Sequence, residues 1–289
     1  MTSFAARTRV TASEIRQAFD RVVLREDEVV VIYSGIWMFG SLLGMPIQQV
    51  PRFLVDLILE TLGPERTVLF PGYTYAYART REFDIALSKP ETGVLSQEVF
   101  ADARFLRTES PLNSYFVTGP RTPEAMRIHD ETLWGDDSLM GWCDHVDARV
   151  CVLGEPWHEA CTNFHRGEEI LRVPYRYFKR FPGVTKNRGE LIGKASPVMY
   201  VRPLNCEMDR DFTAPAKLMA QRGMILDGQH VDFPLESAKA SDIARVSLEL
   251  LDEDPYAFVR NKVRLRRWVA TEKEAEIESL KPEEDPQRP

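Results

Sequence analysis

Short apolar runs and amphipathic stretches alternate along the first part of the chain. Apolar residues recur at helical spacing over 15–24 and 46–62, and Thr11 and Glu14 form a capping box ahead of the first of these predicted helices. Runs made mostly of apolar residues, typical of buried strands, occupy 28–33, 67–70 and 148–153. Because strands that alternate with helices are typical of α/β proteins, we predict an α/β fold.

The pattern changes near residue 190. The charged, proline-bearing segment 271–289 is typical of a frayed helix that becomes disordered. We therefore predict a single domain over 1–270, with room for two lobes that divide near residue 190, and a flexible tail over 271–289. Four elements are expected between the change and the tail: a strand over 194–204, a helix over 211–223, a small hairpin with its turn at Asp227-Gly228, and a long helix over 240–259.

Composition and charge narrow the function classes. The 289 residues are 44% hydrophobic, as in folded enzymes, and the net charge of -7 argues against a nucleic-acid partner. The first ten residues lack a signal-peptide core, and no run reaches the ~18 apolar residues of a membrane helix, so we expect a cytoplasmic protein without a membrane partner. The four cysteines show no metal-ligand spacing, so we expect reduced thiols and no metal. Neither a dinucleotide-binding fingerprint nor a phosphate loop is visible.

The segment CTNFHRGEE, Cys161 to Glu169, carries the first candidate chemistry. If a helix starts with Thr162 as its N-cap, His165 lies in the first turn and Glu168 lies on the same helix face. A carboxylate there can bond one imidazole nitrogen and leave the other as a general base. The same pattern fits an ordinary capped surface helix. Cys161, four residues before His165, is a rival nucleophile, although no oxyanion-loop signature accompanies it.

Seven segments, taken in order, extend this observation. They are YSGIWMFG with Ser34 and Gly40, FPGYTY with Pro71 and Thr74, Phe83-Asp84, Gly93 to Leu95, RTESPLNS with Arg107, Pro111 and Ser114, Trp134 to Ser138, and Leu153-Gly154 followed by Thr162, His165 and Glu168. This order resembles the aminoglycoside 3-N-acetyltransferase family, which uses acyl-coenzyme A and is unrelated to the GNAT fold. Ser110 stands where that family has a histidine. The resemblance implies an aminoglycoside 3-N-acetyltransferase-like sheet flanked by helices.

The resemblance also implies roles for residues. His165 would be the general base and Glu168 would orient it, with direct transfer of the acyl group from acetyl-CoA or a short-chain acyl-CoA to an amine and no metal. Backbone amides of the Ser34 loop would meet the pantetheine, the pyrophosphate or the developing oxyanion. The residues expected to bind the acyl-CoA are Ser34, Gly35, Trp37, Gly40, Pro71, Thr74, Arg107, Ser110 and Ser114. Those expected to bind the acceptor are Tyr73, Tyr75, Asp84, Arg172, Arg176 and Lys179.

Charge around the candidate base bears on the acceptor amine. Seven basic residues against two acidic ones lie between Arg166 and Arg188, which favours an acceptor with a diphosphate, such as a nucleotide-linked amino sugar. The acidic run HDETLWGDD, residues 129–137, instead favours a polycationic aminoglycoside. A thioesterase and a catalytically silent acyl-CoA-binding protein are the other classes that the sequence leaves open. It also leaves open the oligomeric state, including a homo-oligomer.

Overall fold

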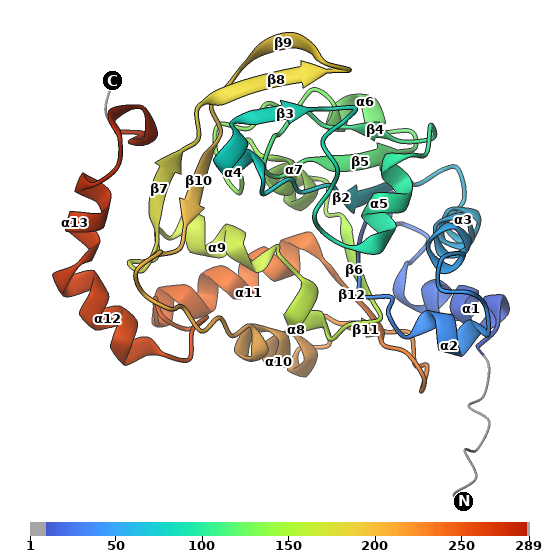
Figure 1. Cartoon of the computed structure of the whole chain (residues 1–289). Helices are drawn as coiled ribbons and strands as arrows, with labels where there is room; N and C mark the ends of the chain where they lie inside the picture. The colour runs from blue at the N-terminus through green and yellow to red at the C-terminus, as the bar shows by residue number, and fades with distance from the viewer. Residues whose placement is uncertain (1–9, 288–289) are drawn as a thin grey trace, which may run out of the picture.

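The computed structural model describes residues 10–287 and is built around a seven-stranded sheet. Segment 1–9, for which we expected no signal peptide, lies outside the described residues. The three predicted strands of the first 160 residues form the centre of this sheet. Across the sheet the order is β11 (Leu226–Asp227), β12 (Leu235–Lys239), β6 (Arg149–Leu153), β1 (Val29–Ser34), β2 (Thr67–Pro71), β5 (Tyr115–Thr118) and β4 (Leu106–Arg107) (Figure 1).

The central strands β6, β1 and β2 run parallel, whereas the strands on either side of them are antiparallel. Val31 of β1 is aligned with Leu69 of β2 and with Val150 of β6. Parallel strands end at the same edge of a sheet, and ligands of α/β proteins commonly bind at that edge. The loops that follow β1, β2 and β6 therefore meet where a site is expected.

Helices cover both faces of the sheet, because its central strands are apolar on both sides. In β1, Val30 and Ile32 pack into one core, and Val29, Val31 and Tyr33 pack into the other. The capping box at the start of α1 is present as predicted. The first core holds α1 (Ala12–Val22), α2 (Phe39–Leu43), α3 (Val50–Leu62) and α5 (Val94–Phe100), and the second holds α7 (Leu139–His145), α9 (Phe164–Ile170), α10 (Thr213–Gln221) and α11 (Ala240–Glu253).

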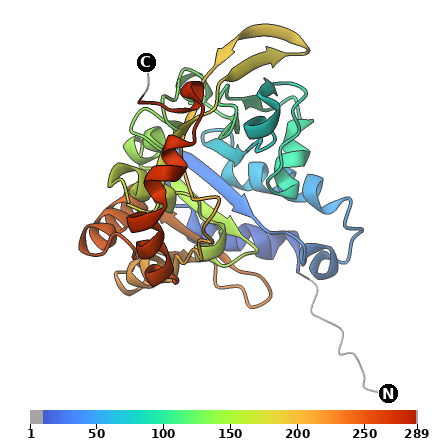
Figure 2. The same cartoon turned by 60° about the vertical axis from the view of Figure 1, so that its left-hand side comes forward.

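Two smaller sheets lie beside the main one. β7 (Tyr177–Arg180) pairs with β10 (Val198–Val201), and β3 (Glu82–Asp84) pairs with β8 (Gly183–Asn187), which forms a hairpin with β9 (Glu190–Ala195). This hairpin projects at the top of Figures 1 and 2. Three short helices lie in the connections: α4 (Tyr77–Thr80), α6 (Thr122–Ala125) and α8 (Trp157–Ala160).

The C-terminal segment continues in helical form. Helices α12 (Lys262–Thr271) and α13 (Lys273–Glu278) and the short 3-10 helix η1 (Pro282–Glu284) run along the side of the molecule opposite α1 and α3 (Figures 1 and 2). Glu284 forms ion pairs with Arg81 and with Lys179, the latter at 3.1 Å. The part of 271–289 that we expected to be a frayed tail is therefore held against β7 by charge pairs.

Two elements of the C-terminal half differ from their predictions. The helix expected over 240–259 ends at Glu253, because Asp254 precedes Pro255 and a residue before proline is driven out of the α region; its backbone is extended. The hairpin of β11 and β12 is present, but its loop is longer than the predicted Asp-Gly turn. The Asp227 carboxylate accepts the Gln229 backbone N–H (2.7 Å) and leads the chain into that loop.

Within residues 10–287, no helix is both long enough and apolar enough to cross a bilayer.

Candidate active site

The loops after β1, β2 and β6 meet at one edge of the sheet and form the candidate site. The contact between the first and third of these loops is close. Gly35 N–H donates to the Leu153 carbonyl (2.9 Å). Gly154 has a φ of 80°, and a Cβ there would lie 2.2 Å from the Gly35 carbonyl oxygen. Only glycine fits this position, which explains the Leu-Gly pair that precedes the candidate base.

The start of α9 differs from its prediction. Thr162 does not cap the helix: Asn163 is at the N-cap position and makes no capping bond. The Thr162 hydroxyl instead donates to the Tyr33 hydroxyl (2.8 Å) and lies 3.1 Å from the Tyr73 hydroxyl. The Asn163 side-chain oxygen accepts a hydrogen bond from the same Tyr33 hydroxyl (3.1 Å). Contacts with β1 and with the loop after β2 thus replace the helix cap that the sequence predicted.

His165 and Glu168 are in contact, as the spacing predicted. His165 Nδ1 and the Glu168 carboxylate form a short hydrogen bond. The same carboxylate oxygen lies 3.0 Å from Arg176 Nη2, and the other accepts a hydrogen bond from the Tyr175 hydroxyl (2.7 Å). Since a carboxylate only accepts, Nδ1 carries the proton in this network and Nε2 keeps its lone pair. His165 therefore has the tautomer that a general base requires.

The environment keeps His165 neutral and Glu168 charged. Burial lowers the pKa of His165 and Arg176 adds to this effect, while Glu168 opposes it. Burial alone would raise the pKa of Glu168, but the Arg176 charge and His165 outweigh it and hold the pKa at about 2. Cys161 is fully buried, which raises the pKa of its thiol to about 12. The thiol is thus protonated at neutral pH, which argues against Cys161 as the nucleophile.

His165 opens onto a cleft of about 480 Å³. Its imidazole packs against two aromatic rings, with centroid distances of 5.2 Å to Trp134 and 5.2 Å to Phe212. These rings limit the movement of the imidazole, so that Nε2 has a defined direction. Besides His165 and Trp134, the cleft is lined by Tyr73, Tyr75, Leu112, Asn113, Leu133, Thr162, Arg176, Met199, Val201, Arg202, Leu204, Met208 and Arg210.

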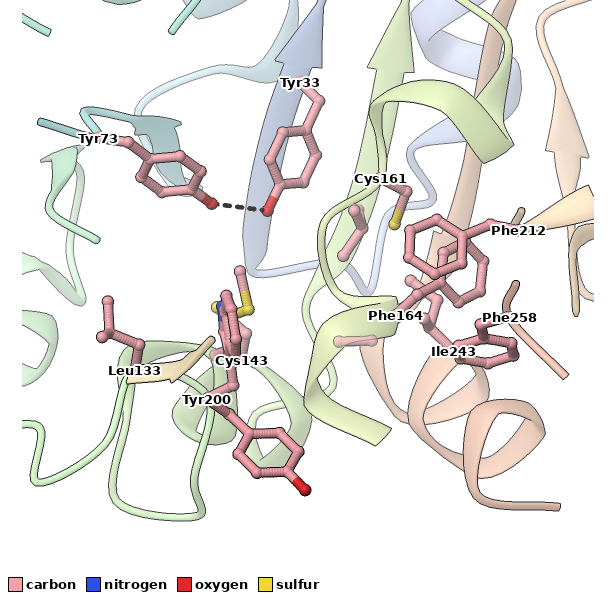
Figure 3. Packing of buried hydrophobic residues seen from close by; sticks show 14 of the residues in the cluster. Tyr33, Tyr73, Leu133, Cys143, Cys161, Phe164, Tyr200, Phe212, Ile243 and Phe258 are labelled. Carbon is pink, nitrogen blue, oxygen red and sulfur yellow. Dashed lines mark hydrogen bonds between the residues drawn. The ribbon is translucent and has the colours of Figure 1, made fainter. Parts of the chain in front are cut away.

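A cluster of buried hydroxyls lies beside this cleft. The Tyr115 hydroxyl lies 3.1 Å from that of Tyr33 and 2.7 Å from that of Tyr73, and Figure 3 shows Tyr33 and Tyr73 directed toward each other. Burial raises the pKa of all three phenols, so they are neutral donors. A smaller cavity of about 150 Å³ adjoins the cluster and is lined by Ser34 and Pro71. Tyr73, Tyr75 and Thr162 line both this cavity and the His165 cleft.

Three residues expected to bind acyl-CoA, Arg107, Ser114 and Thr74, are joined in a buried hydrogen-bond network. The Arg107 guanidinium donates to Ser114 Oγ (3.0 Å), to Thr74 Oγ1 (2.7 Å) and to the Gly72 carbonyl (2.6 Å). Its third nitrogen donates to the Ser88 carbonyl. Burial lowers the pKa of Arg107 to about 10. Because its donors are used within the protein, this arginine stabilises the loops after β2 and β3 rather than offering a free phosphate contact.

Other predicted residues lie outside the two cavities. Trp37 is 73% exposed, and Gly40 lies in α2 against Ile47. The Asp84 carboxylate accepts backbone N–H groups from both its own turn and the turn between β8 and β9, so it ties these segments together. Ser110 lines a separate cleft of about 720 Å³.

The basic stretch after α9 does not form one surface. Arg176 is buried and lines the His165 cleft. Lys179 is paired with Glu284, and Arg180 lines the separate 720 Å³ cleft. Arg172 is exposed and lines neither the His165 cleft nor the small cavity. Arg172, Arg176 and Lys179, which we expect to bind the acceptor, therefore do not line one common cleft.

Some residues of the site were not singled out from the sequence. Tyr33 could have been suspected, since it ends an apolar strand just before a glycine-bearing loop. Tyr115, Asn163, Tyr175, Arg202 and Arg210 gave no such signal, because their roles depend on contacts between distant segments. Among the described residues, 10–287, His, Cys, Asp and Glu side chains form no group of three or more that could hold a metal ion.

Taken together, the fold and site define an α/β protein with a neutral histidine, oriented by a carboxylate, at the carboxyl ends of parallel strands. The family model described as aminoglycoside 3-N-acetyltransferase matches residues 40–252. The chain therefore belongs to this family, which confirms the predicted enzyme class, an acyl-CoA-dependent N-acyltransferase, and its acyl-CoA co-substrate. No curated protein sequence matched the chain.

Solved structures support the fold. The apoenzyme of aminoglycoside acetyltransferase AAC(3)-IVa is 19% identical, with a TM-score of 0.69 over 91% of this chain and 98% of that chain. Sisomicin-bound AAC-VIa is 17% identical, with a TM-score of 0.67 over 85% of this chain and 99% of that chain. The binary complex of AAC-IIIb with CoASH is 16% identical, with a TM-score of 0.68 over 85% and 97%. The predicted fold class, a helix-flanked sheet unlike that of GNAT enzymes, is confirmed.

Proposed function

We propose that this enzyme transfers the acyl group of an acyl-CoA directly to an amine that also carries an anionic group, and that the acceptor is a nucleotide-linked amino sugar. The neutral His165, with Nε2 free and Nδ1 bonded to Glu168, is the observation that supports direct transfer. The arginines of the adjoining cleft support an anionic acceptor.

In this mechanism, the amine binds in the His165 cleft and the pantetheine lies in the smaller cavity, so that the thioester carbonyl sits where the two meet, near Tyr73 and Thr162. The amine nitrogen attacks the carbonyl carbon while His165 Nε2 removes a proton. Neutral hydroxyls or backbone amides at this junction stabilise the oxyanion. Its collapse breaks the C–S bond, and the imidazolium returns the proton to the leaving thiolate. The products are an amide and CoA.

The charge of the cleft determines which acceptors fit. Among the described residues that line it, three are arginines, Arg176, Arg202 and Arg210, and none is a carboxylate. Several ammonium groups on one acceptor would be repelled there, whereas guanidinium groups bind phosphate with paired hydrogen bonds. Arg202 is exposed and makes no hydrogen bond or ion pair within the described chain, so it is free to bind an acceptor phosphate.

The acidic run 129–137 does not reverse this balance. Asp130 and Glu131 line the separate 720 Å³ cleft, which does not include His165. Thr132 also lines this separate cleft, whereas the next residue, Leu133, lines the His165 cleft. This run therefore offers little attraction for a cation at the base.

Acetylation of an aminoglycoside is the second candidate. It is favoured by the family match and by the fold shared with a structure that holds sisomicin. The two candidates share the chemistry at His165 and differ only in the charge of the acceptor, so one assay can separate them.

The test is a matrix of acyl-CoA donors against amines in which CoA release is followed. We expect release with UDP- or dTDP-amino sugars and little with aminoglycosides. Release that needs no amine would indicate a thioesterase. Efficient acetylation of aminoglycosides alone would refute the anionic acceptor while leaving the transferase intact.

A charge reversal then locates the acceptor phosphate. Arg202→Glu should raise the acceptor KM about tenfold or more with little change in the acyl-CoA KM. Arg172→Glu, the same change at an exposed position outside the cleft, is the matched control and should leave both constants unchanged. A rise in the acyl-CoA KM in Arg202→Glu would mean that this arginine binds CoA instead.

A further inference from the structure

Arg176 occupies an unusual place beside the base. It is 3% exposed, and its Nη2 lies 3.0 Å from Glu168 Oε2 and 3.2 Å from His165 Nδ1. Its Nη1 donates to the Tyr200 carbonyl (3.1 Å), which fixes the guanidinium from β10. One carboxylate oxygen of Glu168 is thus shared by a histidine and an arginine.

This sharing affects the proton on His165. A buried carboxylate with an imidazole as its only partner favours the protonated imidazole, because the resulting ion pair has no net charge. In this site Arg176 already balances Glu168. A proton on His165 would then leave a net positive charge in a buried cluster, next to Arg176 itself.

We propose that Arg176 is a positioning residue whose ion pair with Glu168 keeps His165 unprotonated at rest, with its Nε2 lone pair directed into the cleft. This inference rests on the proposed role of His165 as the base. It gives Arg176 a function within the catalytic network, in place of the acceptor-phosphate contact that the sequence suggested.

Two further arginines lie near His165. Arg210 faces the ring from the segment before α10 and also disfavours a proton on it. Arg202, which also lines the cleft, carries a charge of the same sign. The hydroxyl of Tyr73 in the cleft is neutral, because burial raises its pKa. Glu169, on the same helix, is bonded to Thr132, away from the imidazole.

The experiment is a titration of the imidazole of His165 by NMR, assigned among the five histidines by its loss in His165→Gln. In Arg176→Met the apparent pKa of His165 should rise by about 1–3 units, as expected when a neighbouring like charge is removed. The acid limb of kcat/KM should move up by the same amount, with activity recovering at high pH. Arg176→Lys, which keeps the charge, should shift much less.

Two controls separate charge from packing. Tyr175→Phe removes the other hydrogen bond to Glu168 without changing a charge, and it should shift His165 far less than Arg176→Met does. Arg172→Met removes a surface charge and should leave the titration unchanged. Unchanged titration of His165 in Arg176→Met would overturn the proposal, as would equal loss of activity at every pH. If Arg176→Met does not fold, the apparent pKa of His165 in Arg176→Lys is compared with its value in the two controls. A pKa that moves as little as in Arg172→Met supports the role of the charge. A pKa that moves as much as in Tyr175→Phe, or more, contradicts it.

The titration detects the proton on His165 without turnover, so it tests the effect of Arg176 independently of the proposed function. An active His165→Gln variant would show that His165 is not the general base, while the effect of the Arg176 charge on the pKa of His165 could still be measured.

Discussion

Glu168→Gln gives the most informative single perturbation of the site. The amide has the shape of the carboxylate but carries no charge, and its NH2 group can donate to His165 Nδ1. That bond favours the tautomer with the proton on Nε2, which cannot accept a proton from the amine. We expect kcat to fall by about 10²-fold or more, as when a general base is lost.

The same change should destabilise the protein. A pKa of about 2 for Glu168, against 4.5 for an ordinary glutamate, corresponds to about 3 kcal/mol of stability at pH 7. Breaking a buried ion pair by removing one partner costs a similar ~3–5 kcal/mol. Because the pKa of Glu168 is lower in the folded state, this stability is fully present above its unfolded pKa of 4.5 and is lost as the pH falls toward 2. The difference in the free energy of unfolding between Glu168→Gln and the wild type should therefore shrink as the pH falls from 4.5 toward 2.

Glu169→Gln is the matched control on the neighbouring residue. Burial raises the pKa of Glu169 to about 7, so the folded protein binds its proton more tightly than the unfolded chain does. Its ionisation opposes folding above pH 7, and Glu169→Gln should be as stable as the wild type or more stable at pH 8. Denaturant unfolding and kcat, measured for both variants, check the contrast. Wild-type turnover and stability in Glu168→Gln at pH 7 would show that the Glu168 carboxylate neither orients His165 nor stabilises the fold.

Two further substitutions test whether Cys161 is a nucleophile and whether Arg107 binds CoA. Cys161→Ala should retain most activity, because the thiol is buried and protonated. Intact-mass analysis of the enzyme with acyl-CoA alone should show no added acyl group. An acyl adduct that an amine then removes would contradict direct transfer. Arg107→Lys should lower the free energy of unfolding by about 2–4 kcal/mol, because lysine cannot reproduce the several buried hydrogen bonds of Arg107. The acyl-CoA KM of the folded variant should stay unchanged. A large rise in this KM would mean that Arg107 binds CoA.

The parts that sequence predicts well are local. Residues three apart on a helix share a face, so the contact of His165 with Glu168 follows from spacing alone. The apolar runs of the three central strands likewise follow from their composition. The capping box of Thr11 and Glu14 is also local, and it is present.

The placement of the basic residues after α9 could not be predicted, because it depends on where the chain turns. Arg172 adopts a left-handed conformation (φ 50°) at the end of α9, and the Val173 N–H donates to the Glu168 carbonyl, so that Arg176 is carried back to the base. A count of charges after His165 could not show this. In β7, successive side chains then point to opposite faces, which separates Lys179 from Arg180.

Long-range pairing explains the tail as well. Its composition is polar enough for disorder, but Leu280 is buried and Glu284 pairs with Arg81, about two hundred residues earlier in the chain. Partners so distant in sequence leave no local pattern.

The turnover of His165→Gln, measured with the acceptor that gives the fastest CoA release in the matrix, decides whether His165 is the general base of direct acyl transfer. We expect a folded protein with kcat lowered by about 10²-fold or more across the pH range. Near-wild-type turnover in this variant would contradict it.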